Sequence, residues 1–109
     1  MAITYKILGQ LNPTANTLST VYTVPASNSA VISSIVICNL GANATSFRLA
    51  AVPSGNNIST LHYINFDTPI PGSDSIAITI GATLSANDSI RANVVTGNIS
   101  ISIFGSEVY

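Results

Sequence analysis

Residues 98–103 read Asn-Ile-Ser-Ile-Ser-Ile, so Ile99, Ile101 and Ile103 alternate strictly with short polar side chains. Successive side chains of a β-strand point to opposite faces of its sheet, whereas a helix needs apolar residues three or four positions apart. The alternation therefore predicts a β-strand with one buried face and one face in water.

The same period of two recurs along the chain. Residues 76–80 alternate isoleucine with small side chains, and residues 45–51 alternate around Phe47 and Leu49. Residues 30–40 are apolar on both faces, which is typical of a central strand. About eight strands are expected in all, the others covering residues 2–8, 18–24, 58–66 and 89–95.

Turn-forming residues separate these strands. Gly and Asn supply positive φ angles, and Pro fixes φ and ends pairing. Such residues occur at positions 12–13, 25–28, 41–43, 53–57, 69–74, 86–88 and 96–97. No segment of ten or more residues has helical periodicity. The sequence therefore predicts an all-β chain, folded as a single antiparallel β-sandwich or jelly-roll-like domain over residues 1–109.

The composition is apolar and weakly charged. Of the 109 residues, 47% are apolar and 6% are charged, and about a third are Ser, Thr or Asn. A monomer of this mass exposes roughly 5,700 Å², which leaves about one charge per 800 Å², the area that one partner contributes to a standard interface. The net charge of −1 gives little repulsion between copies. This composition predicts a protein that assembles.

Several protein classes are disfavoured. Cys38 is the only cysteine, so no intramolecular disulfide and no oxidising compartment are expected. Residues 1–8 lack the basic start and apolar stretch of a signal peptide, and no apolar run approaches the ~20 residues of a membrane helix. Nucleic-acid binding would call for a basic patch. We expect synthesis in a cytoplasm, with no nucleic-acid, membrane or small-molecule partner.

Residues that could carry chemistry are few and isolated. His62 has no potential metal ligands nearby in sequence, so we interpret it as a satisfied or exposed strand histidine. Cys38 lies in phase with Ile32, Val36 and Leu40, which predicts a small core hydrophobe rather than a reactive thiol. We expect no catalytic residue, no metal ligand and no cofactor-binding residue, and hence no enzyme.

The acidic residues and tyrosines leave two minor alternatives open. Asp67, Asp74 and Asp88 are expected at turns, where an Asp side chain caps its own backbone. Calcium held by turn aspartates is a weaker alternative, because no loop is dense in ligands. A carbohydrate-binding module would need exposed aromatic rings lining a groove; the chain has no Trp and four tyrosines, which are Tyr5, Tyr22, Tyr63 and Tyr109.

A set of short motifs extends over nearly the full length of the chain. They are Tyr-Lys-Ile-Leu-Gly-Gln at 5–10, Val-Tyr-Thr-Val-Pro-Ala at 21–26, Cys-Asn at 38–39, Gly-Ala at 41–42, Ala-Thr at 44–45, Phe-Arg-Leu-Ala at 47–50, His-Tyr-Ile at 62–64, Asp-Thr at 67–68 and Phe-Gly-Ser-Glu at 104–107. In these motifs the chain resembles small virion structural proteins of tailed bacteriophages, including phages of cyanobacteria and other marine bacteria.

The resemblance implies a non-enzymatic part of the virion. Arg48, His62, Tyr63 and Asp67 match its pattern and are expected to organise contacts within or between subunits. The leading hypothesis is a capsid decoration or cement protein on the capsid surface, made in the host cytoplasm. It would bind as a homotrimer at junctions between major capsid protein subunits. Residues 2–9 and 104–109 are candidates to reach across the subunit seams.

Two alternatives stay open. A tail, neck or baseplate accessory protein would have the same composition, and copy number per particle separates it from a decoration protein. A host-surface carbohydrate-binding module predicts exposed tyrosines lining a groove.

Overall fold

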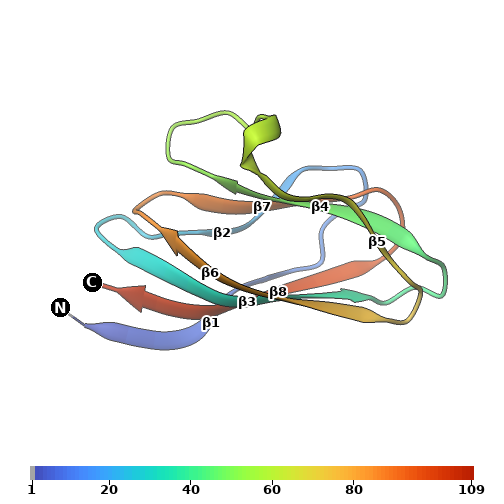
Figure 1. The fold of residues 1–109 in the computed structure, drawn as a ribbon, viewed down its shortest axis with the longest axis horizontal. Coiled ribbons are helices and arrows are strands. Elements are labelled where there is room, and N and C mark those ends of the chain that lie inside the picture. Colours follow the sequence, from blue (N-terminus) through green and yellow to red (C-terminus); the bar gives the residue numbers. More distant parts are fainter. Residues whose placement is uncertain (1) are drawn as a thin grey trace.

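Eight β-strands and one short 3₁₀ turn make up the fold in a computed structural model, which describes residues 2–109 (Figure 1). The elements are β1 (Ile3–Leu11), β2 (Ser19–Thr23), β3 (Ser29–Asn39), β4 (Thr45–Val52), η1 (Thr60–His62), β5 (Tyr63–Ile70), β6 (Ser75–Leu84), β7 (Ser89–Val94) and β8 (Ile99–Val108). Within the described residues, no helix is long and apolar enough to span a membrane.

The strands form two four-stranded antiparallel sheets. Sheet A has the order β1-β8-β3-β6, and sheet B has the order β2-β7-β4-β5. Each strand pairs with its counterpart counted from the other end of the chain: β1 with β8, β2 with β7, β3 with β6 and β4 with β5. The chain is thus one long hairpin rolled across two sheets, which is the arrangement of a jelly roll. The predicted fold class is confirmed.

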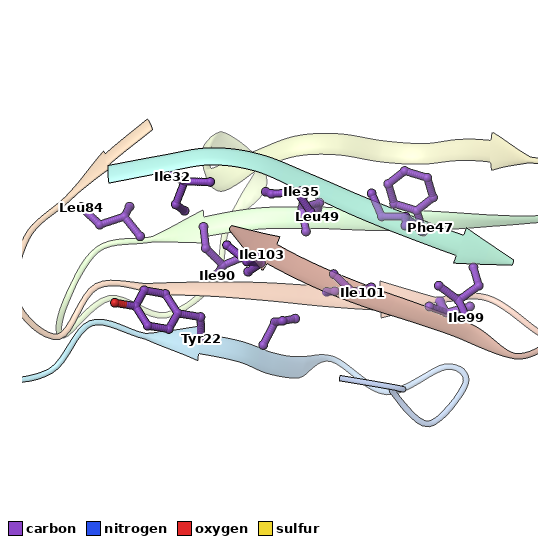
Figure 2. Packing of buried hydrophobic residues seen from close by; sticks show 14 of the residues in the cluster. Tyr22, Ile32, Ile35, Phe47, Leu49, Leu84, Ile90, Ile99, Ile101 and Ile103 are labelled. Atoms are coloured by element: carbon purple, nitrogen blue, oxygen red, sulfur yellow. The ribbon is translucent and has the colours of Figure 1, made fainter. Parts of the chain in front are cut away.

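The core lies between the two sheets. Ile99, Ile101 and Ile103 of β8 are at most 1% exposed, and Phe47 and Leu49 of β4 are fully buried. Figure 2 shows these side chains packed together between the strands. Burying an aliphatic side chain of this size stabilises a fold by about 1.5–3 kcal/mol. The strand predicted from residues 98–103 therefore contributes directly to the core.

The strand predicted at residues 58–66 starts later than expected. Residues 60–62 form η1, and β5 runs from Tyr63 to Ile70, so it includes Pro69, for which the sequence predicts a turn. Proline is tolerated here because β5 is an edge strand of sheet B, where one side of the backbone needs no partner. In Figure 1, η1 lies over sheet B beside β4. This covering explains why Ala50 and Val52 are buried although they point away from the main core.

A β-bulge in β3 overturns the prediction for Cys38. Ser33 is an extra residue relative to β8, so Ile32 and Ile35 both face the core and the following alternation is shifted by one position. Cys38 is half-buried on the outer face of sheet A, and Leu40 is 52% exposed. The strand itself is central, as predicted, because β3 lies between β8 and β6.

The first and the last described residues pair with each other at the surface. Ala2 and Tyr109 exchange backbone hydrogen bonds, and Figure 1 shows the ends side by side. β8 lies between β1 and β3 as far as Val108. The stretch 104–108 is therefore an interior strand and not a free tail, so any contact that it makes with another subunit uses its outward side chains. Of the two terminal strands, β1 alone lies at an edge of its sheet.

Candidate interaction site

Arg48 of β4 and Asp67 of β5 form an ion pair on the outer face of sheet B. Arg48 Nε donates to Asp67 Oδ1 at 2.7 Å, and Nη2 donates to Oδ2 at 3.2 Å. This two-pronged geometry fixes the guanidinium plane as well as its position. The hydrogen bond lowers the pKa of the Asp67 carboxyl and raises the pKa of Arg48. Both side chains remain partly exposed, so a partner can reach them.

A bulge in β5 brings Asp67 to this position. Leu49 pairs with Asn65 and Phe47 pairs with Thr68, so β5 holds one more residue than β4 over the same length. Asp67 has a φ of 52°, in the left-handed region that Asp and Asn tolerate better than other non-glycine residues. The prediction that Asp67 caps a turn is therefore wrong, since its carboxylate faces a strand neighbour.

Two aromatic rings extend the ion pair. Arg48 Cζ lies 3.9 Å from the centre of the Phe66 ring, within range of a cation–π interaction. The rings of Phe66 and Tyr63 meet edge to face, with centroids 4.9 Å apart and an interplanar angle of 82°. Phe66 is 53% exposed. We refer to Arg48, Tyr63, Phe66 and Asp67 as the Arg48 cluster.

The structure brings together most of the residues that the sequence singled out. Arg48, Tyr63 and Asp67 meet in the cluster, as the expected role in contacts requires. Phe66 was missed, and its only signal was its position beside Asp67. His62 is 7% exposed, and its Nδ1 accepts a hydrogen bond from the Ser59 N–H at 3.1 Å. It is a satisfied histidine, as expected, but it lies in η1 rather than in a strand.

The other two aspartates have the turn roles predicted for them. Asp74 Oδ1 accepts from the Ser75 N–H, and Asp88 accepts from the N–H groups of Ser54 and Ser85, all at 2.8 Å. Asp88 therefore joins the loop after β4 to the turn before β7.

A second polar cluster, which the sequence reasoning missed, lies where β1, β2 and β8 meet. Glu107 is 4% exposed; its Oε2 accepts from the Tyr22 hydroxyl at 2.6 Å, and its Oε1 lies 2.8 Å from Lys6 Nζ. The hydrogen bonds from Lys6 and Tyr22 lower the pKa of Glu107, and burial raises the pKa of Tyr22. Lys6 and Glu107 are the only lysine and the only glutamate of the chain, and this is the one feature of the sequence that could have pointed to their pairing. We call this group the Glu107 latch, because it joins sheet A to sheet B.

Residues 2–109 form no pocket and contain no group of three His, Cys, Asp or Glu side chains that could hold a metal ion. Tyr5 and Tyr109 are 82% and 55% exposed, Tyr63 is half-buried, and Tyr22 is buried.

Neither a protein-family model nor a curated protein sequence matches the chain. Among solved structures, those of infectious bursal disease virus strains Gt and Gx align with 97% of this chain, at 9% and 8% identity and a TM-score of 0.48 in each case. The chain spans 30% of the length of each of those chains. At these values, no property of those proteins is transferred to this chain.

Proposed function

We propose that this chain is a non-enzymatic structural protein of a tailed-bacteriophage virion, bound to the capsid surface as a decoration or cement protein. The observation that carries the proposal is the Arg48 cluster. Arg48, Tyr63 and Asp67 belong to the motifs in which the chain resembles small virion proteins, and here they form one partly exposed surface. Arginine and aromatic side chains are the residues that most often dominate the energy of protein interfaces.

The cluster is ordered before any partner arrives. Asp67 and the Phe66 ring hold the Arg48 guanidinium in one orientation, so binding a shell immobilises few additional side-chain bonds. Such preorganisation lowers the entropic cost of association. Leu61, 81% exposed in η1, lies two residues before Tyr63 and adds apolar area near the cluster.

Stabilisation of the shell follows from mass action. A protein that binds the assembled shell but not its separated subunits stabilises the shell by about 2.7 kcal/mol per site when its free concentration is 100 times its Kd. In the finer form of the proposal, homotrimers bind at the junctions between major capsid protein subunits. Each trimer then contacts several shell subunits at once, which raises its avidity.

The test uses phage particles that lack this protein, to which the purified chain is added back. We expect the wild-type chain to bind and to raise the temperature at which the particles release their genome. Arg48→Gln and Phe66→Ala should each weaken binding by about 30-fold, the scale of a ~2 kcal/mol interface residue. Val95→Ser is the matched control, because Val95 is also exposed but lies in the turn after β7. Particles that release their genome equally readily with and without the chain would overturn the proposal.

Copy number tests the location on the particle. We expect quantitative mass spectrometry of purified particles to give about one copy per major capsid subunit, or one trimer per local symmetry axis. A ratio of a few per cent would move the protein to the tail, neck or baseplate. Absence of the chain from particles would contradict any virion role.

A further inference from the structure

The outer face of sheet A can be traced from the strand register. Ile99, Ile101 and Ile103 of β8 face the core, so the residues that alternate with them face outward. The outward residues at the end of β8 lie beside outward residues of β1 and β3. Among them, six apolar side chains gather on neighbouring strands, and we call them the apolar sector: Ile3, Tyr5, Ile7, Val31, Phe104 and Val108.

The apolar sector is open to solvent in the isolated chain. Tyr5 is 82% exposed, Ile7 is 52% exposed and Ile3 is 50% exposed. Ile3 lies opposite Val108 and Ile7 lies opposite Phe104, so the exposed area continues from β1 onto β8. Contiguous exposed apolar area of this kind marks an interaction surface rather than ordinary scattered exposure.

No Lys, Arg, His, Asp or Glu side chain faces outward from the described strands of sheet A. Lys6 is the one charged residue of β1, and it points inward to Glu107. Arg48, Asp67 and Arg91 belong to sheet B. A partner can therefore cover the whole outer face of sheet A without removing an ion from water, the step that makes polar interfaces costly.

The two sheets also differ in how their edges are protected. In sheet B, β5 contains Pro69 and the bulge at Asp67, and β2 has only five residues. In sheet A, the edge strand β1 has nine residues and no proline. Bulges, prolines and short length are the usual means by which edge strands avoid pairing with other chains. The β1 edge has a bulge but is neither short nor interrupted by proline, and it lies next to the apolar sector.

We propose that a second copy of this chain covers the outer face of sheet A, with the apolar sector as the main contact. Four strands about 4.8 Å apart, with about nine residues rising ~3.3 Å each, span roughly 600 Å². Two such faces bury about 1,200 Å² in total, which reaches the range of specific, stable interfaces. A second copy suits this face for two reasons. The whole chain has a net charge of only −1, so two copies repel each other little, and the second copy offers the same face without charged side chains. Two identical faces packed against each other close at two copies, so this contact rests on no part of the proposed function and does not itself build the trimer.

Sedimentation equilibrium of the purified chain tests this contact. We expect the wild-type chain to sediment as an oligomer, and Ile7→Lys and Tyr5→Lys each to raise its dissociation constant at least 100-fold. Leu61→Lys is the matched control, because it places the same charge on an equally exposed apolar position over sheet B. Thermal unfolding of each variant checks that it folds. If Ile7→Lys does not fold, Tyr5→Lys provides the test, because Tyr5 is 82% exposed and contributes little to the fold.

The reactivity of Cys38 gives a second measurement of the contact that needs no substitution in the wild-type chain. Cys38 lies on the outer face of sheet A, so a second copy that covers this face should shield its thiol. Its labelling by a maleimide should slow as the wild-type oligomer forms. A thiol placed on sheet B, in the variant Cys38→Ser with Asn93→Cys, should react at an unchanged rate. A chain that is monomeric at all concentrations, or an oligomer dissociated by Leu61→Lys but not by Ile7→Lys, would overturn the assignment. An oligomer of two copies dissociated by Ile7→Lys supports the face assignment and contradicts the trimer of the proposed function.

Discussion

At the scale of single residues, Glu107 is the side chain whose environment departs furthest from that of a surface charge. A buried carboxylate costs several kcal/mol unless its oxygens are paired and hydrogen-bonded. Here each oxygen has one donor, Lys6 from β1 and Tyr22 from β2. The Lys6 side chain is 45% exposed, so forming the ion pair does not require burying two full charges. The latch therefore holds the two sheets together at the edge where β1 and β2 meet.

Glu107→Gln should destabilise the protein by about 1–3 kcal/mol, the range for a buried hydrogen bond to a charged group. The amide keeps the shape of the side chain and can still accept from Tyr22, so the loss isolates the contribution of the charge. Urea unfolding measures it. Asp74→Asn is the control, because Asp74 is exposed and bonds only to the neighbouring Ser75 N–H. Equal small losses in both variants would show that the latch contributes nothing beyond a surface carboxylate.

The latch should also make stability depend on pH. The pKa of Glu107 is lower in the folded state than the ordinary value of about 4.3 in the unfolded state, so the folded chain binds fewer protons between the two values. The contribution is present in full above the unfolded pKa and is lost as pH falls through the folded pKa. The lowered pKa of Asp67 acts in the same direction. Urea midpoints measured from about pH 6 to about pH 2 should fall less steeply for Glu107→Gln than for the wild type; parallel curves would contradict this account.

At the scale of the elements, a close approach between the two sheets depends on Gly9. A Cβ atom at this position would lie 2.5 Å from the Val21 carbonyl oxygen and 3.2 Å from Tyr22 Cβ. The carbonyl is backbone and cannot rotate away, so β1 and β2 would have to separate. This separation would also pull apart Lys6 and Tyr22, which β1 and β2 bring to Glu107.

Gly9→Ala should therefore destabilise the fold by about 1–3 kcal/mol, as for other overpacked sites. Gly81→Ala is the matched control within the same sheet, because a Cβ atom there meets nothing within 4 Å. Thermal unfolding of the two variants makes the comparison. If Gly9→Ala unfolds at the same temperature as Gly81→Ala, the tight approach of β1 to β2 is not needed for stability.

How far the sequence predicts the elements depends on the bulges. Alternation identifies β8 and β4 correctly, because no extra residue interrupts the core positions from Ile99 to Ile103 or from Phe47 to Leu49. In β3 the extra residue Ser33 inverts the alternation, so the sequence pattern predicts the wrong face for Cys38. A bulge is fixed by the register of the partner strand, which a single segment does not contain. Predicting the Arg48 cluster and the Glu107 latch from the sequence would also have required knowing which strands are neighbours.

At the scale of the whole molecule, the two sheets share one core. The inward residues of both sheets form a single buried cluster, to which every strand except β1 contributes at least one buried residue. A domain of this size with one core generally unfolds in one cooperative transition. The sequence predicted this sandwich from the alternation and the turns, but not the nested strand order, because pairing between β1 and β8 leaves no local signal.

Ile101→Ala should cost about 2–5 kcal/mol, because Ile101 is 1% exposed and its removal leaves a cavity between the sheets. Ile78→Ala deletes the same atoms from β6, where the side chain is only partly buried, and should cost clearly less. Both variants should retain a single unfolding transition by calorimetry. A biphasic transition in either one, or equal losses in both, would contradict the description of one shared core.

The nested pairing also implies an order of events during folding. The connection between β4 and β5 closes the shortest loop, and each further pair encloses all those before it, until β1 meets β8 across almost the entire chain. Longer loops carry a larger entropic cost of closure, and non-local pairing slows folding. We therefore infer that the chain closes from its middle outward and that β1 is the last strand to join. Molecules that have not completed this final step expose the edge of β8 and the inner side of β1. We therefore expect pairing with a neighbouring unfolded chain to be most favoured at the end of folding.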